Sequence, residues 1–578
     1  MSGKQMNSNP SVAEYVVQRL AALGIKHVFG LPGDFAFPID NAFEACKELT
    51  WIGCSNELNA AYSADGYARV HGAAILCTTY NVGEAAALAG VMGCKAERVP
   101  VFHVVGAPSA RMERNRRHMH HAYGDGNLDQ FHHYNQVSAC ASAYLTPENA
   151  IPEMERVIFA ALSQRMPAYI QIPQDYALMP VVGVPVHGVP LAKAPTFSSN
   201  AQELNAALTA ILSRLTKAKS PVILSAFTIG RYGLQKELEA LLAATGIPFA
   251  TTGMSKGLLS ESHPLYLGMY NGEASKGDVR KIVEGADLVL DLGGVLYCDA
   301  DTGGYSAYLD SSKLVTVWPD YVKIGSAAVT GGRGEATYSP IHIKDVLEEL
   351  TKQAPKFKTP TFSQPAPFSA SGASGDRVTD FSVFSRVQRF LASGDTIVAD
   401  AGTGDLLATE MLLPDGVHFH HAALWNCIGW GTAAALGVAL ANPTRRVILV
   451  QGDGGHQLTA NQIGTMGRYG VNPIILLLNN GIFGIEEIVL GNSDPAKIRH
   501  YDRIAPWQYH KLPEAMGCCD WFCTSVKTNA EFDAALEKAR KHPGAAYVEI
   551  LLGCEKIVPG LPAEALDRIY QTGPPKDS

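Results

Sequence analysis

Two polar side chains in the last third of the chain follow strand-like segments and are of types that bind metal ions. Residues 447–450 form an apolar run that leads into Gly452-Asp453-Gly454-Gly455. A helical pattern covers residues 457–468, and a second apolar run at 474–478 ends in Asn479-Asn480. This order predicts a β-α-β unit with a glycine turn. Because ligands bind at the carboxyl ends of parallel strands, we expect Asp453 and Asn480 to meet there.

The donor types in this unit indicate a cation held by oxygen atoms. Carboxylate, amide and backbone carbonyl oxygens suit a hard octahedral ion such as Mg²⁺, which bridges to phosphate oxygens rather than filling an all-protein cage. Gly454 and Gly455 would let backbone N–H groups approach a diphosphate at the start of a helix. For the Gly-Asp-Gly tripeptide alone, a turn that merely closes a strand is the alternative. The paired strand ends favour the cation site.

Another carboxylate begins a helix near the N-terminus. In the segment 54–69, Glu57 follows a strand-like run and precedes an alanine-rich stretch. Taken alone, Glu57 could be a charge that the helix dipole favours at a helix start. A catalytic role for it depends on the wider pattern of motifs described below.

Three further clusters carry ionisable side chains. Asp34 stands after the first strand-like segment, and a histidine-rich string, His118-Met119-His120-His121, lies farther along the same third of the chain. The third cluster is Ile485-Glu486-Glu487, six residues after Asn480 in the case of Glu486. A histidine-rich string is also compatible with a surface loop or a metal site. The loop interpretation is the one we adopt for His118, His132 and His133.

The elements that must position these side chains form three α/β units. Helical apolar periods alternate with short apolar runs, a pattern typical of doubly wound domains with mostly parallel sheets. Linkers at 183–199 and 353–376 divide the chain into residues 1–190, 200–355 and 375–578, the last including a C-terminal tail. The strand candidates are 27–29, 74–77 and 101–105 in the first unit, 222–225, 287–291 and 314–317 in the second, and 396–399, 447–450, 474–478 and 546–551 in the third.

The composition is that of an ordinary globular chain. Of 578 residues, 47% are apolar and 18% charged, and the formal net charge is -8, so a nucleic-acid-binding surface is not suggested. No apolar run reaches the length that spans a bilayer, and the N-terminal stretch lacks a signal-peptide pattern. The 11 cysteines have no small-scaffold spacing, which indicates reduced thiols. We therefore expect a cytoplasmic protein without membrane or nucleic-acid partners.

Taken together, the motifs resemble those of the thiamine diphosphate-dependent enzymes. The family's signature is Gly-Asp-Gly followed by Asn-Asn, and here Asn480 stands 27 positions after Asp453. This resemblance implies that Mg²⁺ is held by Asp453, Asn480 and the carbonyl of Ile482. The segment 54–69 resembles the pyrimidine-binding motif, in which the glutamate, here Glu57, hydrogen-bonds N1′ of the aminopyrimidine. The resemblance also implies further cofactor contacts from Thr79, Thr403, Ile428, Gly454 and Gly455.

Within that family the chain resembles the pyruvate and indolepyruvate decarboxylases. Asp34, His120, His121 and Glu486 match their set of two acids and paired histidines, and residues 78–83 and 100–109 are similar as well. The similarity covers nearly the whole chain and is least diagnostic in the middle unit and after residue 490. It implies non-oxidative decarboxylation of a 2-oxo acid to an aldehyde and CO₂ through a thiamine diphosphate ylide and an enamine. The two acids and the two histidines would relay protons.

The resemblance has consequences for assembly and substrate size. In this family the two half-sites meet across a subunit interface, so we expect at least a homodimer, with a homotetramer as the endpoint. The segment 402–407 lacks the bulky aromatic of pyruvate-specific relatives, so we expect a 2-oxo acid larger than pyruvate, with Ile485 and Val489 lining an apolar wall. Asp405 is either a first-turn helix charge or a partner for a polar substituent. The preferred 2-oxo acid and any allosteric activation stay open.

Other functions fit the motifs less well. Pyruvate decarboxylase proper is the alternative on substrate. An acetolactate synthase-type carboligase shares the three-unit layout and the cofactor, but its pattern lacks the paired histidines and normally includes FAD in the middle unit. A nucleotide-binding dehydrogenase would need Gly-x-Gly-x-x-Gly at a helix start and an acidic residue about 20 positions later, for which no convincing match exists. A scaffold protein would not need Glu57, Asp453 and Asn480 together.

Overall fold

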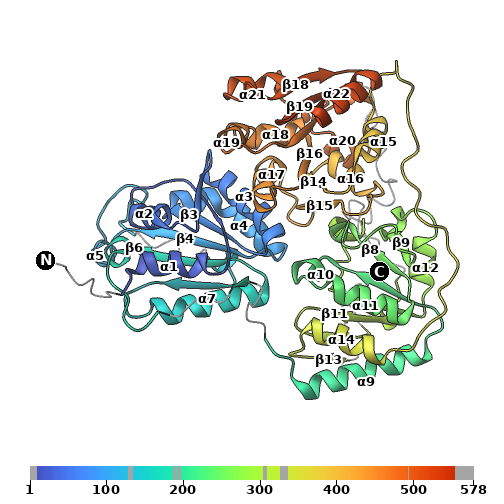
Figure 1. Cartoon of the computed structure of the whole chain (residues 1–578), viewed down its shortest axis with the longest axis horizontal. Coiled ribbons are helices and arrows are strands. Elements are labelled where there is room, and N and C mark those ends of the chain that lie inside the picture. The colour runs from blue at the N-terminus through green and yellow to red at the C-terminus, as the bar shows by residue number, and fades with distance from the viewer. Residues whose placement is uncertain are drawn as a thin grey trace, which may run out of the picture.

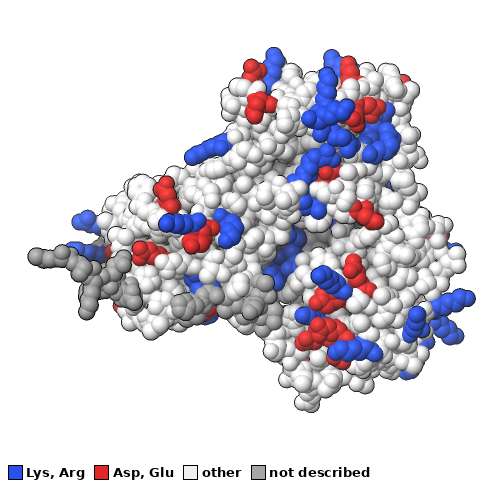
Figure 2. All heavy atoms as spheres, in the orientation of Figure 1, with Lys and Arg blue, Asp and Glu red and all other residues white. Residues whose placement is uncertain are grey.

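The computed structural model contains three α/β domains, each built around its own sheet (Figure 1). It describes residues 9–127, 135–185, 190–191, 197–303, 309–325, 336–492 and 494–553. The expected architecture of three α/β domains with mostly parallel sheets is confirmed. Among these residues, no helix is both long and apolar enough to cross a membrane. Acidic and basic side chains are interspersed over the face shown in Figure 2.

The first domain has a six-stranded, entirely parallel sheet in the order β2-β1-β3-β4-β6-β5. Its strands are β1 His27–Gly30, β2 Thr50–Gly53, β3 Ala74–Thr79, β4 Val101–Ala107, β5 Ala141–Tyr144 and β6 Ala168–Pro173. Its helices are α1 Val12–Ala21, α2 Phe37–Ala45, α3 Glu57–His71, α4 Val82–Ala96, α5 Ala110–Arg114, α6 Asn135–Ser138, α7 Ala150–Gln164 and α8 Gln174–Ala177.

The middle domain has seven strands in the order β13-β12-β11-β10-β7-β8-β9, and the two pairings that involve β12 are antiparallel. Its strands are β7 Pro221–Ser225, β8 Phe249–Thr251, β9 Tyr266–Met269, β10 Leu288–Leu292, β11 Leu314–Val317, β12 Val322–Ile324 and β13 Ala336–Tyr338. Its helices are α9 Ala201–Lys217, α10 Phe227–Arg231, α11 Gln235–Thr245, α12 Val279–Gly285, α13 Asp299–Thr302 and α14 Ile343–Gln353.

The third domain again has a six-stranded parallel sheet, in the order β15-β14-β16-β17-β19-β18. Its strands are β14 Asp395–Ala399, β15 His418–His421, β16 Arg446–Gly452, β17 Ile474–Asn479, β18 Phe522–Val526 and β19 Ala546–Leu551. Its helices are α15 Asp380–Phe390, α16 Thr403–Thr409, α17 Trp430–Ala441, α18 Asp453–Thr459, α19 Gln462–Arg468, α20 Gly484–Val489, α21 Leu512–Ala515 and α22 Asn529–Lys541.

The ten strand candidates all coincide with strands, within one or two residues at their ends. The single helix expected over residues 457–468 is wrong, because two helices, α18 and α19, occupy the segment and α18 already begins at Asp453. Asn461 lies between the two helices, and its carbonyl accepts a hydrogen bond from the Ser55 hydroxyl at 3.1 Å. A side chain of the first domain therefore binds the backbone where the two helices separate.

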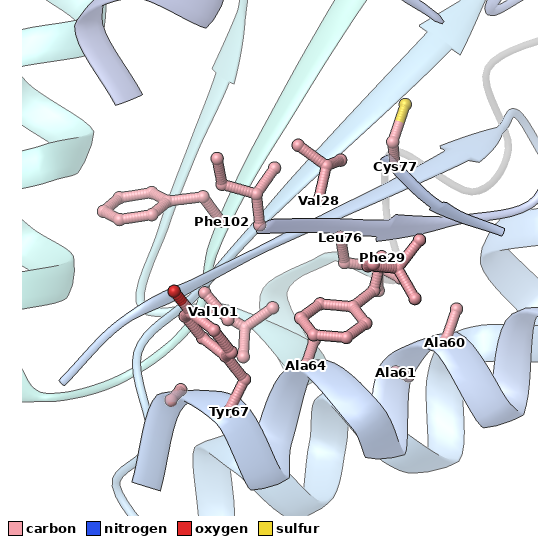
Figure 3. Packing of buried hydrophobic residues seen from close by; sticks show 14 of the residues in the cluster. Val28, Phe29, Ala60, Ala61, Ala64, Tyr67, Leu76, Cys77, Val101 and Phe102 are labelled. Carbon is pink, nitrogen blue, oxygen red and sulfur yellow. The ribbon is translucent and has the colours of Figure 1, made fainter. Parts of the chain in front are cut away.

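Small residues let α3 of the first domain pack on two surfaces at once. One side covers its own sheet, where Figure 3 shows Phe29 and Leu76 close to alanines of α3. The other side packs against α17 of the third domain. A Cβ at Gly66 would lie 2.3 Å from the Ala434 carbonyl oxygen, and one at Gly437 would lie 1.9 Å from that of Ser63. The alanine-rich sequence of α3 thus follows from backbone contact between two domains.

A buried ion cluster joins the same two domains. The Arg69 guanidinium contacts Asp65 at 2.7 Å and Glu97 at 2.8 Å, and its Nη1 donates to the His421 carbonyl at 2.6 Å. The Trp430 indole donates to Asp65 at 2.7 Å. Because every charge here has a partner, the cluster fixes the orientation of the two domains without leaving a charge buried and unpaired.

Candidate active site

Glu57 lies at the first position of α3, as the sequence predicts. Asn56 caps the helix, because its side chain accepts a hydrogen bond from the Asn59 backbone N–H at 2.8 Å. The Glu57 side chain is half-buried and faces Gly83, where an added Cβ would lie 3.4 Å from the Glu57 Oε1 atom. A glycine at the start of α4 therefore keeps space open beside this carboxylate.

Thr79 lies at the end of β3 between two glycines. A Cβ at Gly33 would lie 2.5 Å from the Thr79 Cβ, and one at Gly83 would lie 3.2 Å from the Thr79 Cγ2. The Thr79 hydroxyl is buried and has no hydrogen-bond partner among the described residues. Leaving such a group unpaired costs roughly 1–3 kcal/mol. A bound polar group at this position would satisfy it.

Asp34, His120 and His121 form one cluster although they are distant in sequence. The His120 Nε2 atom lies 2.8 Å from Asp34 Oδ2. A carboxylate oxygen of Asp34 and one ring nitrogen of each histidine all lie within 4.8 Å of one another. The two imidazole rings meet edge-on at 4.6 Å. Burial, together with the neighbouring His120, lowers the pKa of His121, and the Asp34 carboxylate opposes this shift. The cluster therefore joins an acid, its hydrogen-bonded histidine and a more easily deprotonated one.

Asp453 is a buried carboxylate at the beginning of α18, directly after β16. Its Oδ1 accepts from the Gly454 N–H at 3.0 Å and its Oδ2 accepts from the Gly481 N–H at 2.7 Å. Burial raises the pKa of Asp453 to about 7, although these backbone hydrogen bonds oppose the shift. A cation bound here would stabilise the ionised form of this carboxylate and lower its pKa.

Asn480 and Ile482 bring the end of the neighbouring strand to the same place. Asn480 follows β17, and its Oδ1 accepts from the Ile482 N–H at 3.1 Å. The Ile482 carbonyl accepts from the Gly484 N–H at 3.0 Å and keeps a second lone pair. The Gly481 N–H that binds Asp453 links the two strand ends. The predicted convergence of Asp453 and Asn480 at one sheet edge is therefore present, with oxygen donors suited to Mg²⁺.

Packing demands glycine at Gly454 and Gly455 independently of any ligand. A Cβ at Gly454 would lie 2.5 Å from the Phe483 ring, and one at Gly455 would lie 2.4 Å from Asp400 Oδ2. Both glycines lie in the first turn of α18, where N–H groups have no partner within the helix. The same two residues thus allow close packing and present donors to an anion.

Asp400 organises the loop that carries Ile428, a role that sequence reasoning missed. Its carboxylate accepts from the Gly429 N–H at 2.9 Å and the Gly431 N–H at 2.7 Å. Burial raises the pKa of Asp400 to about 7, and the two N–H groups oppose this shift. Ile428 is half-buried beside Gly455. The signal in the sequence was the place of Asp400 immediately after a predicted strand, at the edge where ligands bind.

Thr403 is the first residue of α16, and Asp405 lies in the same first turn. The Asp405 carboxylate lies 2.9 Å from Nδ1 of His421 in β15. Burial lowers the pKa of His421, but the charge of Asp405 outweighs it, so the pKa is raised overall. Asp405 is therefore both a first-turn charge and half of a buried ion pair. This pairing was not predicted, and it argues against a free carboxylate waiting for a polar substituent.

Glu486 and Glu487 are adjacent in α20 and have opposite environments. Glu487 is buried and contacts the Arg499 guanidinium at 2.9 Å. Glu486 is exposed, while Ile485 and Val489 are half-buried. Only Glu486 of the pair is thus available for chemistry on a ligand.

The site residues therefore fall into two groups on different domains. Glu57, Thr79 and the cluster of Asp34, His120 and His121 belong to the first domain. The other group is in the third domain and consists of Thr403, Ile428, Asp453, Gly454, Gly455, Asn480, Ile482 and Glu486.

Comparisons with known proteins match a family model to part of each of the three domains. Models of three thiamine pyrophosphate enzyme domains match the chain, the N-terminal TPP binding domain at residues 10–133, the central domain at 208–332 and the C-terminal TPP binding domain at 400–550. The chain is 35% identical over 548 residues to an alpha-keto-acid decarboxylase of Mycolicibacterium paratuberculosis, with 94% of each chain covered. It is 32% identical to the Mycobacterium leprae protein of the same name, with 99% of each covered.

A solved structure shares the fold. The thiamine diphosphate-dependent 4-hydroxybenzoylformate decarboxylase of Rhodococcus jostii superposes with a TM-score of 0.75 at 19% identity, over 94% of this chain and 99% of that chain. With two thiamine-binding domains flanking a central one and extended identity to alpha-keto-acid decarboxylases, the chain belongs to the thiamine pyrophosphate enzyme family.

Proposed function

We propose that the protein is a thiamine diphosphate- and Mg²⁺-dependent decarboxylase that converts a 2-oxo acid into an aldehyde and CO₂. The observation that carries this proposal is the cluster of Asp34, His120 and His121 in a chain with two thiamine-binding domains. Relatives at 32–35% identity that bear the name alpha-keto-acid decarboxylase support the same reaction. Paired histidines with acids provide the proton donors that aldehyde formation needs.

The third domain would hold the charged end of the cofactor. Asp453, Asn480 and the Ile482 carbonyl would coordinate Mg²⁺. The Gly454 and Gly455 N–H groups, with Thr403, would bind the diphosphate. The fit rests on a buried carboxylate whose pKa burial raises to about 7 and on a set of carboxylate, amide and carbonyl oxygens.

The first domain would bind the reactive ring of the cofactor. Glu57 would share a proton with the aminopyrimidine, and the unpaired Thr79 hydroxyl would bind a polar atom nearby. Ile428, from the third domain, would pack against the cofactor. When bound, thiamine diphosphate supplies a thiazolium that accepts the electrons released as CO₂ departs.

The proton relay would act on the carbon that loses CO₂. Asp34 lies in hydrogen-bonding contact with His120, and burial together with the neighbouring His120 lowers the pKa of His121, so that this imidazole gives up a proton more readily. Glu486, exposed on α20, would face the departing carboxylate from the third domain. An acid supplied at this carbon yields the aldehyde.

We infer that the substrate is larger than pyruvate. The first turn of α16 presents Thr403, Gly404 and Asp405 rather than an aromatic ring, and the Asp405 side chain pairs with His421. Ile485 and Val489 lie one helical turn apart on α20, beside Glu486. An apolar substituent buried there would gain about 0.8 kcal/mol per methylene.

We infer at least a homodimer, with a homotetramer as the endpoint. Large apolar side chains are exposed near both groups of site residues: Val82, beside Gly83, is 51% exposed, Leu458 of α18 is 48% exposed and Trp507 is 38% exposed. Such side chains near a site suit burial by a second chain. A cytoplasmic location is proposed as well, since the ten described cysteines are free thiols.

A substrate panel tests the proposed reaction. The protein, supplied with thiamine diphosphate and Mg²⁺, is incubated with several 2-oxo acids, and aldehyde and CO₂ are quantified. Equal amounts of both products, lost when either cofactor is omitted, are expected. CO₂ accompanied by a 2-hydroxy-2-methyl-3-oxo acid in place of aldehyde would identify a carboligase instead. Absence of CO₂ from every substrate would refute the proposal.

A further inference from the structure

The backbone of every residue in the Asp34 cluster accepts a hydrogen bond from a side chain outside the cluster. The Tyr80 hydroxyl donates to the His120 carbonyl at 2.5 Å. The Asn81 Nδ2 group donates to the His121 carbonyl at 2.9 Å. On the other side, the Gln174 Nε2 group donates to the Asp34 carbonyl at 2.7 Å. The cluster is thus bound through main-chain atoms, which leaves the imidazole and carboxylate groups available for chemistry.

The two donors to the histidines come from a rigid part of the domain, whereas the histidines do not. Tyr80 and Asn81 directly follow β3, a central strand whose residues are all buried, and are only 2% and 7% exposed themselves. His120 and His121 lie outside any helix or strand, and the His120 side chain is 57% exposed. The two hydrogen bonds therefore attach the backbone that carries the two rings to the buried end of β3.

Backbone conformation at the contact supports the same interpretation. Asn81 and His121 have φ angles of 48° and 67°, a left-handed region that residues other than glycine seldom adopt. Asn81 is held there by Glu84, whose Oε2 accepts from the Asn81 N–H at 2.5 Å, and Glu84 is itself bound by the Tyr169 hydroxyl. Two unusual conformations that bind one another are typical of a site where geometry is specified for function.

We propose that Tyr80 and Asn81 are positioning residues for the proton relay, acting through the carbonyl groups of His120 and His121. This inference rests on the proposed function, because the relay is part of it. The Tyr80 ring also packs edge-on against Phe35 at 4.8 Å, and Phe35 contacts the His120 ring at 5.0 Å. Loss of either donor lets one imidazole move, so proton transfer slows while the cofactor contacts in the third domain stay intact.

Two substitutions remove the donors with little other change. Tyr80→Phe deletes one hydroxyl. Asn81→Gly deletes the amide but tolerates the positive φ angle, so it separates the hydrogen bond from backbone strain. Tyr232→Phe is the matched control, because the Tyr232 hydroxyl donates to a main-chain carbonyl, that of Ser163, at 2.9 Å outside the site. We expect kcat to fall roughly tenfold in both test variants, with KM and cofactor affinity within about twofold of wild type.

A double-mutant cycle distinguishes positioning from general support of the fold. If Tyr80 acts through His120, Tyr80→Phe lowers kcat in the wild type but adds nothing to His120→Ala. The corresponding result is expected for Asn81→Gly combined with His121→Ala. Full activity in both single variants would overturn the proposal, and so would losses that multiply in both double variants.

A readout independent of turnover separates this proposal from the proposed function. In protein labelled at histidine, the imidazole titration of His121, assigned with the His121→Ala variant, is followed by NMR. We expect its pKa to move in Asn81→Gly and to stay unchanged in Tyr232→Phe. An unmoved His121 titration would overturn the positioning role of Asn81 even if the wild type releases CO₂. A moved titration in a protein that releases none would uphold the positioning role and refute the decarboxylase assignment.

Discussion

The two halves of the candidate site are built in opposite ways. In the third domain, Asp453 is 1% exposed and is held by backbone N–H groups where a strand passes into a helix. In the first domain, the Asp34 and His120 side chains are 46% and 57% exposed, and side chains of other segments hold their backbone. The proposed anchoring site thus belongs to a buried sheet edge, whereas the groups proposed to move protons lie on a loop whose backbone is held by other segments.

The difference also indicates why neither half is sufficient alone. The third domain offers oxygen donors and helix N–H groups, but its described residues bring no cluster of histidines to the Asp453 edge. The first domain offers acids and imidazoles at an open surface. Electrostatic interactions between such groups and a ligand become stronger when water is excluded from the site. We infer that the two regions are halves of one active centre.

Loss of the anchoring carboxylate should have the largest effect. Asp453→Ala removes the only charged donor of the proposed Mg²⁺ set, so cofactor affinity should fall by more than about a hundredfold and aldehyde formation should disappear at ordinary cofactor concentration. Isothermal titration with thiamine diphosphate and Mg²⁺ measures this. Asp520→Ala, at an exposed aspartate of the same domain, is the control. Undiminished cofactor binding by Asp453→Ala would remove the metal assignment.

Change at the first-domain carboxylate should separate turnover from binding. Glu57→Gln keeps the shape of the side chain but removes its charge, so kcat should fall by about a hundredfold or more, while cofactor binding is largely retained. The two quantities come from steady-state kinetics and from the same titration. A loss of bound cofactor equal to that of Asp453→Ala would contradict the division of labour between the two halves.

The neighbouring glutamates of α20 offer a comparison within one helix turn. Glu486→Gln should lower kcat by roughly a hundredfold with the stability unchanged, and His121→Ala should do the same from the first domain. Glu487→Gln instead weakens the buried contact with Arg499 and should reduce the free energy of unfolding by about 1–3 kcal/mol. Denaturant unfolding and kinetics together assign each effect. Full activity in Glu486→Gln would remove this residue from the relay.

Substrate size should give the smallest effect. If the space beside the first turn of α16 is open, each added methylene contributes about 0.8 kcal/mol, or roughly fourfold in kcat/KM. The comparison uses pyruvate, 2-oxoisovalerate, a linear six-carbon 2-oxo acid and phenylpyruvate. We expect the larger acids to be preferred. A clear preference for pyruvate would mean that other side chains fill the pocket.

More of the third-domain group of site residues than of the first-domain group could be predicted from local sequence patterns. Asp453 and Asn480 converge because the ends of adjacent parallel strands must lie together, and that rule depends only on local patterns. The pairing of Asp34 with His120 could be expected only from family resemblance, because it spans 86 positions.

Contacts between distant segments account for what was not predicted. The Tyr80 and Asn81 hydrogen bonds, the pairing of Asp405 with His421 and the separation of α18 from α19 each depend on a partner set by tertiary packing. Neither hydrophobic periodicity nor local motifs encode such partners. The antiparallel strands β12 and β13 escaped detection for another reason, since each has only three residues.

Complementation between two inactive variants tests most directly whether the two regions form one centre shared by two chains. Glu57→Gln and Asp453→Ala chains are co-expressed with different tags, and mixed dimers are compared with each variant alone for aldehyde and CO₂ formation. If the centre joins the first domain of one chain to the third domain of another, one of the two sites in each mixed dimer carries neither change, so purified mixed dimers regain about half of the wild-type sites. If each chain completed its own centre, the mixture would be as inactive as its parents, and the shared-centre account would be contradicted.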